Sequence, residues 1–291
     1  MNIKEIIDIL YENSLIKSNE LEFKALKSGT TSGVLYTLFV DNTPTYVVKI
    51  DHPSIINSTK DFLLAYQDVQ LLPKVLYIND NKEFIVYTFI SGETHFNRGS
   101  KLRWMTRLTK ELFNQYLKVD QNIPWGRVNG IKRKSWSDFN QASLESAKEN
   151  IGDLLPIEDH KRVASLVSAL RNYYIHEEKY YLHGDAGVHN FVYSENELKG
   201  VIDPSPIIGT RIYDFTYAFC SSPDSLDMNT LMTSFSLWNG NTLFSKERLL
   251  DEILFQLYTR ALEFVLKCTL TILTIICRLG ENGESICIGR L

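Results

Sequence analysis

Residues 180–203 read YYLHGDAGVHNFVYSENELKGVID, and this stretch sets the expectation for the rest of the chain. Apolar residues lead into a short polar loop that contains His183, Asp185 and Asn190. Two segments rich in β-branched and aromatic residues then flank the polar tetrad Ser-Glu-Asn-Glu, a pattern typical of a β-hairpin. Symmetric pairing about this tetrad is expected to place Asn190, where the chain enters the hairpin, opposite Asp203, where it leaves.

The polar residues of this stretch are of the kinds that hold a metal ion and accept a proton. The amide oxygen of Asn190 and the carboxylate of Asp203 are hard oxygen ligands, which Mg²⁺ prefers. A second carboxylate, Asp185, lies five positions before Asn190 and is left to act on a substrate proton. Phosphoryl transfer needs metal ligands and a proton acceptor near one phosphate. The stretch therefore predicts a phosphoryl-transfer enzyme.

The same residues resemble the HGDxxxxN motif and the later metal-binding aspartate of the aminoglycoside phosphotransferase and choline kinase-like family, relatives of the protein kinases. The motif falls on His183, Gly184, Asp185 and Asn190, and the later aspartate falls on Asp203. The resemblance implies that Asp185 is the catalytic base and that His183 shapes the loop by hydrogen bonding. It implies that Asn190 and Asp203 bind Mg²⁺ and that ATP or GTP is the phosphoryl donor.

Composition excludes several other classes of protein. The chain has 291 residues, of which 44% are apolar and 23% charged, as in an ordinary globular protein. The net charge of −4 gives no basic field for nucleic acid. Charged residues interrupt the most apolar stretch, residues 253–277, and the N-terminus lacks a signal-peptide pattern, so we expect no membrane association and a cytoplasmic protein. The cysteines lack CxxC spacing and predict reduced thiols: Cys220, Cys268, Cys277 and Cys287.

The first third of the chain predicts one helix and then a small sheet. Apolar residues at helical spacing indicate an amphipathic helix over residues 3–11. Short β-type runs separated by turn residues follow at residues 21–26, 35–40, 46–50, 74–78 and 83–90. The resemblance implies that residues 1–92 form a nucleotide-binding lobe built on an antiparallel sheet.

Small residues between the first two strands predict a loop that covers the phosphates of the nucleotide. Their lack of bulk lets the main chain approach a phosphate closely, although such a segment is also a common hairpin turn. The candidates are Ser28, Gly29, Thr30, Ser32 and Gly33. Lys49 ends the third strand in the sequence YVVKI, where kinase-like folds place the lysine that pairs with the α- and β-phosphates.

Two further parts of the nucleotide site follow from the resemblance. Kinase-like folds orient the lysine with a glutamate, but no glutamate occurs in residues 51–71. Asp61 is the expected replacement, and another orientation for Lys49 stays open because the aspartate side chain is shorter. Phe89 and Ile90 lie where main-chain groups would meet an adenine edge, although the same residues also suit an edge strand that ends in a turn.

The remainder of the chain is predominantly helical. Helices are expected over residues 102–117, from Ser137 as N-cap, over residues 158–174 and over residues 226–277. In the insertion before the catalytic loop, Trp125 and Trp136 either shape an acceptor pocket or pack the insertion onto the lobe, and packing is favoured for Trp136. The resemblance implies a larger, mostly helical lobe over residues 93–291.

One polar residue beyond the hairpin has a predicted structural role. Asp214, at the start of a predicted helix, matches the family aspartate that fastens the catalytic loop from behind, and a carboxylate at a helix N-terminus is favourable for the helix dipole. His189, inside the catalytic motif, is assigned no role.

These observations predict an α+β, two-lobed, protein-kinase-like fold and an ATP-dependent phosphotransferase. The expected acceptor is a hydroxyl of a small molecule: an aminoglycoside, another antibiotic, an amino alcohol or a sugar amine. One alternative is a regulatory protein that binds nucleotide without turnover, which the absent glutamate favours. A protein kinase is a weaker alternative because only ten residues separate Asp203 from Asp214, leaving little room for a peptide platform.

Overall fold

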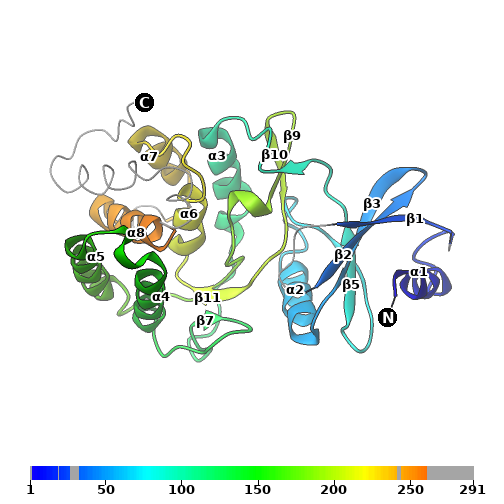
Figure 1. Cartoon of the computed structure of the whole chain (residues 1–291), viewed down its shortest axis with the longest axis horizontal. Helices are drawn as coiled ribbons and strands as arrows, with labels where there is room; N and C mark the ends of the chain where they lie inside the picture. Colours follow the sequence, from blue (N-terminus) through cyan, green and yellow to red (C-terminus); the bar gives the residue numbers. More distant parts are fainter. Residues whose placement is uncertain (1, 19, 27–32, 241–243, 261–291) are drawn as a thin grey trace.

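The computed structural model describes residues 2–18, 20–26, 33–240 and 244–260. A small sheet with two helices lies at one end of the molecule, and a larger, mostly helical body lies at the other (Figure 1). This is the two-lobed α+β architecture that the sequence predicts. No helix in the described ranges is long and apolar enough to cross a membrane.

The small lobe is built on a five-stranded antiparallel sheet with the strand order β1-β2-β3-β5-β4. Its strands are β1 Glu22–Leu26, β2 Val34–Val40, β3 Thr43–Ile50, β4 Val75–Ile78 and β5 Phe84–Thr88. Its helices are α1 Ile3–Glu12 and α2 Pro53–Ala65. Strand β3 begins three residues before its predicted start, because Asp41 and Asn42 alone form the turn. Both have positive φ, as a two-residue hairpin turn requires.

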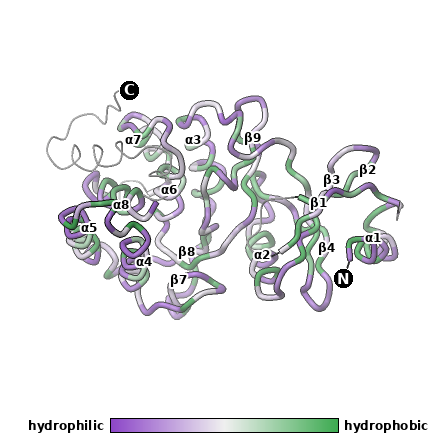
Figure 2. Tube along the Cα trace, viewed as in Figure 1, coloured by the Kyte–Doolittle hydropathy of each residue, from purple (hydrophilic) through white to green (hydrophobic). Residues whose placement is uncertain are grey.

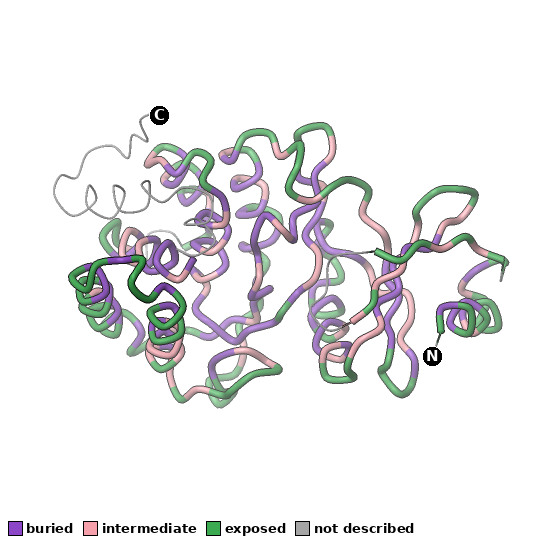
Figure 3. The backbone as a smooth tube through the Cα atoms, viewed as in Figure 1, coloured by how far each residue is buried: buried purple, intermediate pink, exposed green. Residues whose placement is uncertain are grey.

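The two faces of this sheet are covered by different helices. Alternate residues of a strand point to opposite faces, so neighbouring positions enter different cores. Val48 and Val86 pack with α1, whereas Val47 and Ile85 pack with α2 and with the helical body. Burial is uneven across the sheet, since β5 is almost entirely buried whereas β1 is mostly exposed, and α1 carries exposed residues on its outward side (Figure 3).

The lobes meet at several places, among them the chain connection at Gly92 and a side-chain contact at Asn129. Strand β6 Glu93–Thr94 pairs with β9 Phe191–Ser194 of the catalytic hairpin. Just before it, Gly92 has a φ of +141°, and a Cβ there would lie 2.4 Å from the Tyr193 carbonyl oxygen, so only glycine fits. On the other side of the molecule, the Asn129 side-chain amide donates to Ser58 Oγ of α2 at 2.6 Å and to the Ser54 carbonyl at 3.2 Å.

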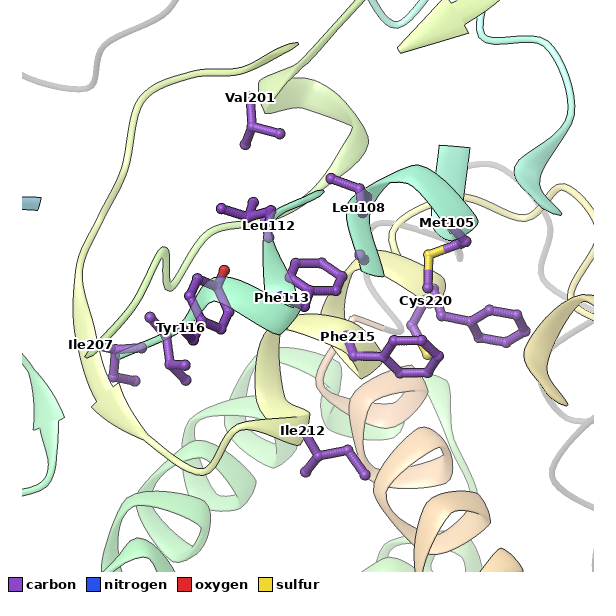
Figure 4. Close-up of a cluster of buried hydrophobic side chains, with 14 of the residues drawn as sticks. Met105, Leu108, Leu112, Phe113, Tyr116, Val201, Ile207, Ile212, Phe215 and Cys220 are labelled. Atoms are coloured by element: carbon purple, nitrogen blue, oxygen red, sulfur yellow. The ribbon is translucent and has the colours of Figure 1, made fainter. Parts of the chain in front are cut away.

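The large lobe is a set of helices around one apolar core. Its helices are α3 Lys101–Glu111, α4 Trp136–Ile151, α5 Ile157–Leu170, α6 Ile212–Phe219, α7 Met228–Ser236 and α8 Lys246–Thr259, with short 3₁₀ turns η1 Phe113–Gln115, η2 Gly152–Leu154 and η3 Arg171–Tyr173. Figure 2 shows hydrophilic and hydrophobic residues alternating around α4, α5 and α8, as expected for helices with one buried side. Met105, Leu112 and Phe215 belong to the core beneath the catalytic loop (Figure 4).

Three helix boundaries differ from the prediction, and one of them is the end of α5, which stops at Leu170 and not at residue 174 because a 3₁₀ turn follows. The helix expected over residues 102–117 ends at Glu111, because the backbone at Leu112 leaves the α-region and a 3₁₀ turn follows. The N-cap of α4 is Ser135 and not Ser137. Ser135 Oγ accepts from the Asp138 backbone N–H, and the Asp138 carboxylate accepts in return from the Ser135 N–H, which is a complete capping box.

The insertion tryptophans both pack in the interior. Trp136 is almost fully buried, stacks on Phe139 at 4.6 Å between ring centroids and meets Trp125 at 5.8 Å. The predicted packing role of Trp136 is therefore confirmed, and Trp125 shares it. Cys220 is fully buried, and burial raises the pKa of its thiol to about 12, as expected for an inert core cysteine. The other three cysteines and the predicted helical residues 261–277 lie outside the described ranges.

A buried polar chain ties α4 to α8. Asn140 of α4 donates to Tyr174 Oη at 3.0 Å, and this hydroxyl donates to Glu252 Oε1 of α8 at 2.8 Å. Arg248 lies 3.7 Å from Glu252 and pairs with Glu177 at 2.7 Å, so one guanidinium serves two carboxylates. Burial raises the pKa of Glu252 to about 7, with only partial relief from Arg248 and Tyr174.

Candidate active site

The catalytic loop connects two small sheets. Strand β8 Tyr180–Leu182 leads into it, and the 3₁₀ turn η4 Val188–Asn190 leads out of it into the hairpin of β9 and β10 Glu197–Val201. Gly184 has a φ of +78°, and a Cβ there would lie 2.1 Å from the Ser205 carbonyl oxygen. The glycine of the motif is therefore required by the close approach of the segment after Asp203.

His183 holds this loop together from a fully buried position. Its Nε2 lies 3.1 Å from the Ile202 carbonyl oxygen, and its Nδ1 accepts from the Asp185 backbone N–H at 3.3 Å. Burial lowers the pKa of His183 to about 4, so the ring is neutral and carries its proton on Nε2. The ring also meets Phe62 of α2 edge-on at 5.6 Å. His183 thus links both arms of the hairpin region to the small lobe.

Three side chains donate to the carboxylate of Asp185. Tyr217 Oη donates to Oδ1, while Asn190 Nδ2 at 2.9 Å and His189 Nε2 at 3.1 Å contact Oδ2. Burial raises the pKa of Asp185, but His189 and Tyr217 outweigh this effect and hold the pKa below its ordinary value. Asp185 is therefore ionised at neutral pH. Burial raises the pKa of Tyr217, so its hydroxyl remains a donor.

The side-chain amide of Asn190 donates its hydrogens to Asp185. Nδ2 donates to the Asp185 carbonyl oxygen and to Asp185 Oδ2, both at 2.9 Å. An amide that donates through its nitrogen presents its oxygen as the remaining acceptor, which is the atom that a cation would need.

The predicted pairing of Asn190 with Asp203 is wrong by one residue. Symmetric pairing about residues 194–197 would place Val201 opposite Asn190, but a bulge between Leu198 and Gly200 shifts the register by one. Val201 therefore pairs with Phe191, and the Ile202 N–H donates to the Asn190 carbonyl oxygen. Asp203 lies one position further along, with a φ of +53°. Aspartate tolerates this left-handed conformation better than most residues do.

Lys49 reaches across from the sheet to Asp203. The lysine is buried near the end of β3, and its Nζ lies 2.6 Å from Asp203 Oδ1. The prediction that Asp61 orients Lys49 is wrong: Asp61 is half exposed on α2, where it pairs with Lys60 at 2.9 Å and accepts from Asn57. Asp203 instead holds the lysine.

The predicted phosphate loop lies largely outside the described residues, which include only Gly33 of its candidates: Ser28, Gly29, Thr30 and Ser32 fall in the gap at 27–32. Gly33 passes close to the end of β3, since a Cβ there would lie 2.5 Å from the Ile50 carbonyl oxygen. At the predicted adenine edge, the Phe89 N–H donates to the Thr45 carbonyl oxygen at 2.8 Å, which occupies that donor. The Ile90 side chain lies against Gly200 of β10. The adenine contact stays a prediction.

Asp214 fastens the catalytic loop from behind. Its carboxylate accepts from the Gly184 N–H at 3.1 and 3.2 Å and from Tyr116 Oη at 2.5 Å. Burial raises the pKa of Asp214 to about 6, against the opposing effect of these hydrogen bonds. The predicted structural role of Asp214 is what these contacts show.

Three residues at the site have no role in the sequence-based assignment. His189 contacts Asp185 although it is given no function, and Tyr217 contacts Asp185 from α6. Arg127 Nη1 donates to the Gly184 and Ser205 carbonyl oxygens, both at 3.2 Å. Tyr217 follows Asp214 by three positions and so lies on the same side of α6, a spacing that could have identified it.

Comparison with known proteins supports the fold. No protein-family model and no curated protein match the sequence. Solved structures do match: a choline kinase from Cryptosporidium parvum Iowa II is 14% identical, with 97% of each chain covered and a TM-score of 0.64. The GDP complex of wild-type aminoglycoside 2'-phosphotransferase-IIIa is 14% identical over 97% of this chain and 98% of that chain, with a TM-score of 0.59.

A third match is a ternary complex of the aminoglycoside phosphotransferase APH(2")-IIa with streptomycin and ATP. It is 17% identical over 97% of both chains, with a TM-score of 0.55. These neighbours are small-molecule kinases, and the present chain has the protein-kinase-like fold that they share.

Proposed function

We propose that the protein transfers the γ-phosphoryl group of ATP or GTP to a hydroxyl group of a small molecule. One observation carries the proposal. Asp185 accepts a hydrogen bond from Asn190, and Lys49 forms an ion pair with Asp203, within the fold of the small-molecule kinases. These four residues are called the catalytic cluster below. We further propose that residues 1–92 bind the nucleotide and that residues 93–291 supply the catalytic and acceptor-binding groups.

The oxygen donors of the cluster fit Mg²⁺. The amide oxygen of Asn190 and the carboxylate of Asp203 would hold the ion, with water and phosphate oxygens completing its shell, as Mg²⁺ prefers. In the described ranges, no three acidic, histidine or cysteine side chains are arranged so that they could hold a metal ion together, so a cage made only of such ligands is not the favoured arrangement there. When bound, Mg²⁺ would neutralise charge on the transferring phosphates.

Asp185 has room for one more donor. A carboxylate offers about four lone-pair sites, two on each oxygen. His189 and Asn190 contact Oδ2, whereas only Tyr217 contacts Oδ1 among the described residues. The acceptor hydroxyl would therefore donate to Oδ1 beside the Tyr217 hydroxyl. Because the pKa of Asp185 is low, the carboxylate would be ionised when the hydroxyl arrives.

The proposed reaction is a direct displacement. The acceptor oxygen forms a bond to the γ-phosphorus, and the bond from that phosphorus to the bridging oxygen breaks. The nucleoside diphosphate leaves, and the acceptor proton passes to Asp185 and then to water. Lys49 would pair with the phosphates while Asp185 orients the attacking oxygen, since positioning and charge stabilisation supply most of the catalysis in this chemistry.

The segment after Asp203 favours a small acceptor over a protein. Only ten residues separate Asp203 from Asp214, and β11 Ile207–Gly209 among them pairs with both β8 and β7 Gly126–Arg127. A segment held in a sheet on both sides is unsuited to serve as the flexible platform with which protein kinases bind peptides.

The test is nucleoside diphosphate release from ATP and from GTP, with a panel of aminoglycosides, macrolides, amino alcohols, sugar amines, hydroxy acids and sugar phosphates. Asp185→Asn serves as the control for contaminating hydrolysis. Acceptor-dependent release by the wild type alone supports the proposal. Tight nucleotide binding with no release across the panel would favour the regulatory alternative, and labelled phosphate on a generic protein substrate would favour a protein kinase.

A further inference from the structure

A cavity of 370 Å³ lies between residues 126–133 and helix α4, which together are called the acceptor wall. Volumes of this size accommodate small ligands. Its lining residues are Arg127, Gly130, Ile131, Arg133, Phe139, Ala142, Ser143, Ser146, Ala147, Asn150 and Thr259. Two of these residues are arginines and none is acidic, so the described lining carries positive charge that no carboxylate of the lining neutralises.

The backbones of both arginines are fixed by strand pairing. Arg127 lies in β7 and pairs with Ile207 of β11. Arg133 pairs with Trp125, with both backbone hydrogen bonds present at 2.9 and 3.1 Å. The backbone from which each guanidinium group extends is therefore fixed by the fold. A fixed backbone lowers the conformational entropy that is lost when a ligand binds.

The hydrogen-bond donors of these arginines are only partly used. Nη1 of Arg127 donates to Gly184 and Ser205, while its Nε and Nη2 have no hydrogen-bond partner in the described part of the chain. The guanidinium of Arg133 has no carboxylate partner within the same ranges. Lys132, in contrast, donates to the Arg127 and Val128 carbonyl oxygens and so serves the loop itself.

Arg127 connects the cavity to the catalytic loop. The same guanidinium group that belongs to the cavity lining lies 3.2 Å from the carbonyl oxygen of Gly184, the residue before Asp185. A second route runs through aromatic rings: Phe139 of the lining meets Tyr213 at 5.9 Å, and Tyr213 meets Tyr217, which contacts Asp185. The cavity is therefore connected to the loop of Asp185 through Arg127 and through this row of rings, while Asp185 itself lies outside its lining.

We infer that this cavity binds the acceptor and that the acceptor carries an oxyanion group, a carboxylate or a phosphate, in addition to its reacting hydroxyl. The inference rests on the proposed function, because it names the substrate class of the same site. Arginine donors match the geometry of both oxyanions. A polycationic amino sugar would instead meet two like charges, which is unfavourable.

The rest of the lining suits the body of such a molecule. Ile131 is 74% exposed at the rim, and Phe139 presents a partly buried ring, so both offer apolar contact. Ser146 and Asn150 lie one turn apart on α4 and offer exposed hydrogen-bonding groups. An acceptor with a short polyhydroxyl or cyclic body and one anionic end fits these surroundings.

The first experiment measures acceptor selectivity with matched pairs that differ in the anionic group. Glycerate is compared with glycerol, and glucose 6-phosphate with glucose, with gentamicin as the polycation. Nucleoside diphosphate release and calorimetric binding to the protein loaded with ADP and Mg²⁺ are both recorded. The expected result is binding or turnover of at least one anionic member in preference to its neutral partner. The carboxylate and phosphate pairs show which oxyanion is preferred.

The second experiment assigns this preference to Arg133. Arg133→Gln should reduce the preference for the anionic member roughly tenfold to a hundredfold, the size expected for a lost hydrogen bond to a charged group. Arg133→Lys should restore part of it. The control is Lys134→Gln, which removes a neighbouring exposed charge that does not line the cavity and should leave the preference unchanged.

The outcomes separate this inference from the proposed function. Turnover of neutral or polycationic acceptors without any anionic preference would overturn the inference and leave the kinase proposal intact. Absence of anion binding to the ADP-loaded protein, or equal anion binding by wild type and Arg133→Gln, would overturn it as well. Failure to bind nucleotide or to release diphosphate with any acceptor would contradict the proposed function itself.

Discussion

The catalytic cluster and the acceptor wall differ in how their polar groups are satisfied. Within the cluster, Asp185 and Asn190 bond to each other, and Lys49 pairs with Asp203. On the wall, Arg127 and Arg133 line a cavity that has no carboxylate among its described residues. The charged groups of the cluster thus have hydrogen-bond or ion-pair partners within the protein, whereas some guanidinium donors on the wall have none among the described residues. From this difference, and from the functions proposed above, we expect the cluster to perform the chemical step and the wall to distinguish between ligands.

The largest effect is expected where the cluster acts on the acceptor. Asp185→Asn should lower kcat by ~10²–10⁴-fold, the typical contribution of a general base. This corresponds to roughly 3–5.5 kcal/mol of barrier. Nucleotide affinity in the same variant should change little, because Asp185 faces the acceptor hydroxyl. Steady-state kinetics with calorimetric nucleotide binding tests both statements, and near-normal turnover would remove Asp185 from its role.

A pH-dependent stability effect is expected at Glu252, which the buried polar chain links to helix α4. The pKa of Glu252 is about 7 in the folded chain, above the ordinary value, so the folded state holds a proton that the unfolded state lacks between pH 4.5 and 7. Stability should therefore fall as pH rises through this window and level off above it, by up to ~3 kcal/mol.

Glu252→Gln mimics the protonated acid and should reduce this slope, leaving the part that comes from Asp214, whose pKa burial raises to about 6. Denaturant unfolding at pH 5, 6, 7 and 8 measures the effect, with Glu145→Gln on the exposed side of α4 as control. Parallel pH profiles for wild type and Glu252→Gln would show that the acid is not the titrating group.

An intermediate effect is expected on the metal side of the cluster. Asp203→Ala should weaken Mg²⁺-dependent nucleotide binding by ~10–100-fold, and Asn190→Ala by less, since a charged ligand offsets more phosphate charge. Because Lys49 would lose its partner, Asp203→Ala should also bind metal-free nucleotide more tightly than the wild type does. Titrations with and without Mg²⁺ test this, with Asp61→Ala as control. Full retention of the Mg²⁺ response in Asp203→Ala would place the metal elsewhere.

The smallest effect is expected where the wall touches the small lobe. Asn129→Ala removes the hydrogen bonds to Ser54 and Ser58 and should lower the free energy of unfolding by about 1 kcal/mol or less. The KM for the acceptor should rise while the kcat of the saturated enzyme is preserved. Thermal unfolding and acceptor kinetics measure the two quantities. A large loss of kcat would mean that this contact positions the cluster and not only the wall.

The cluster could be predicted from sequence because its chemistry restricts residue type and spacing within one short segment. His183, Asp185 and Asn190 lie within eight positions, and Asp203 closes the same hairpin. The register error at Asn190 came from the unequal lengths of the two hairpin arms: symmetric pairing about residues 194–197 would place Val201 opposite Asn190, and the bulge beside Gly200 moves the partner to Ile202, one short of Asp203. A glycine inside a strand pattern is itself a bulge signal. Asp214 was equally accessible because its position at a helix start follows from local sequence.

The partners of Lys49 and Asp185 could not be predicted in the same way, because they depend on tertiary distance. The lysine takes Asp203, which lies 154 positions away, in preference to Asp61 on the neighbouring helix. Tyr217 reaches Asp185 from α6 across 32 positions. The acceptor cavity depends on how residues 126–133 pack against α4, and residue types alone do not determine such packing.

The ion pair of Lys49 and Asp203 also bears on which form of the nucleotide the site accepts. Without ligand, each charge neutralises the other at 2.6 Å. A nucleotide that arrives with its cation supplies a positive partner for Asp203 and a negative partner for Lys49, so the exchange leaves no charge stranded. A nucleotide without its cation attracts the lysine but leaves a partly buried carboxylate beside phosphates. Under the proposed function, the pair would act as an electrostatic filter that favours the nucleotide–metal complex, set within the protein before any substrate enters.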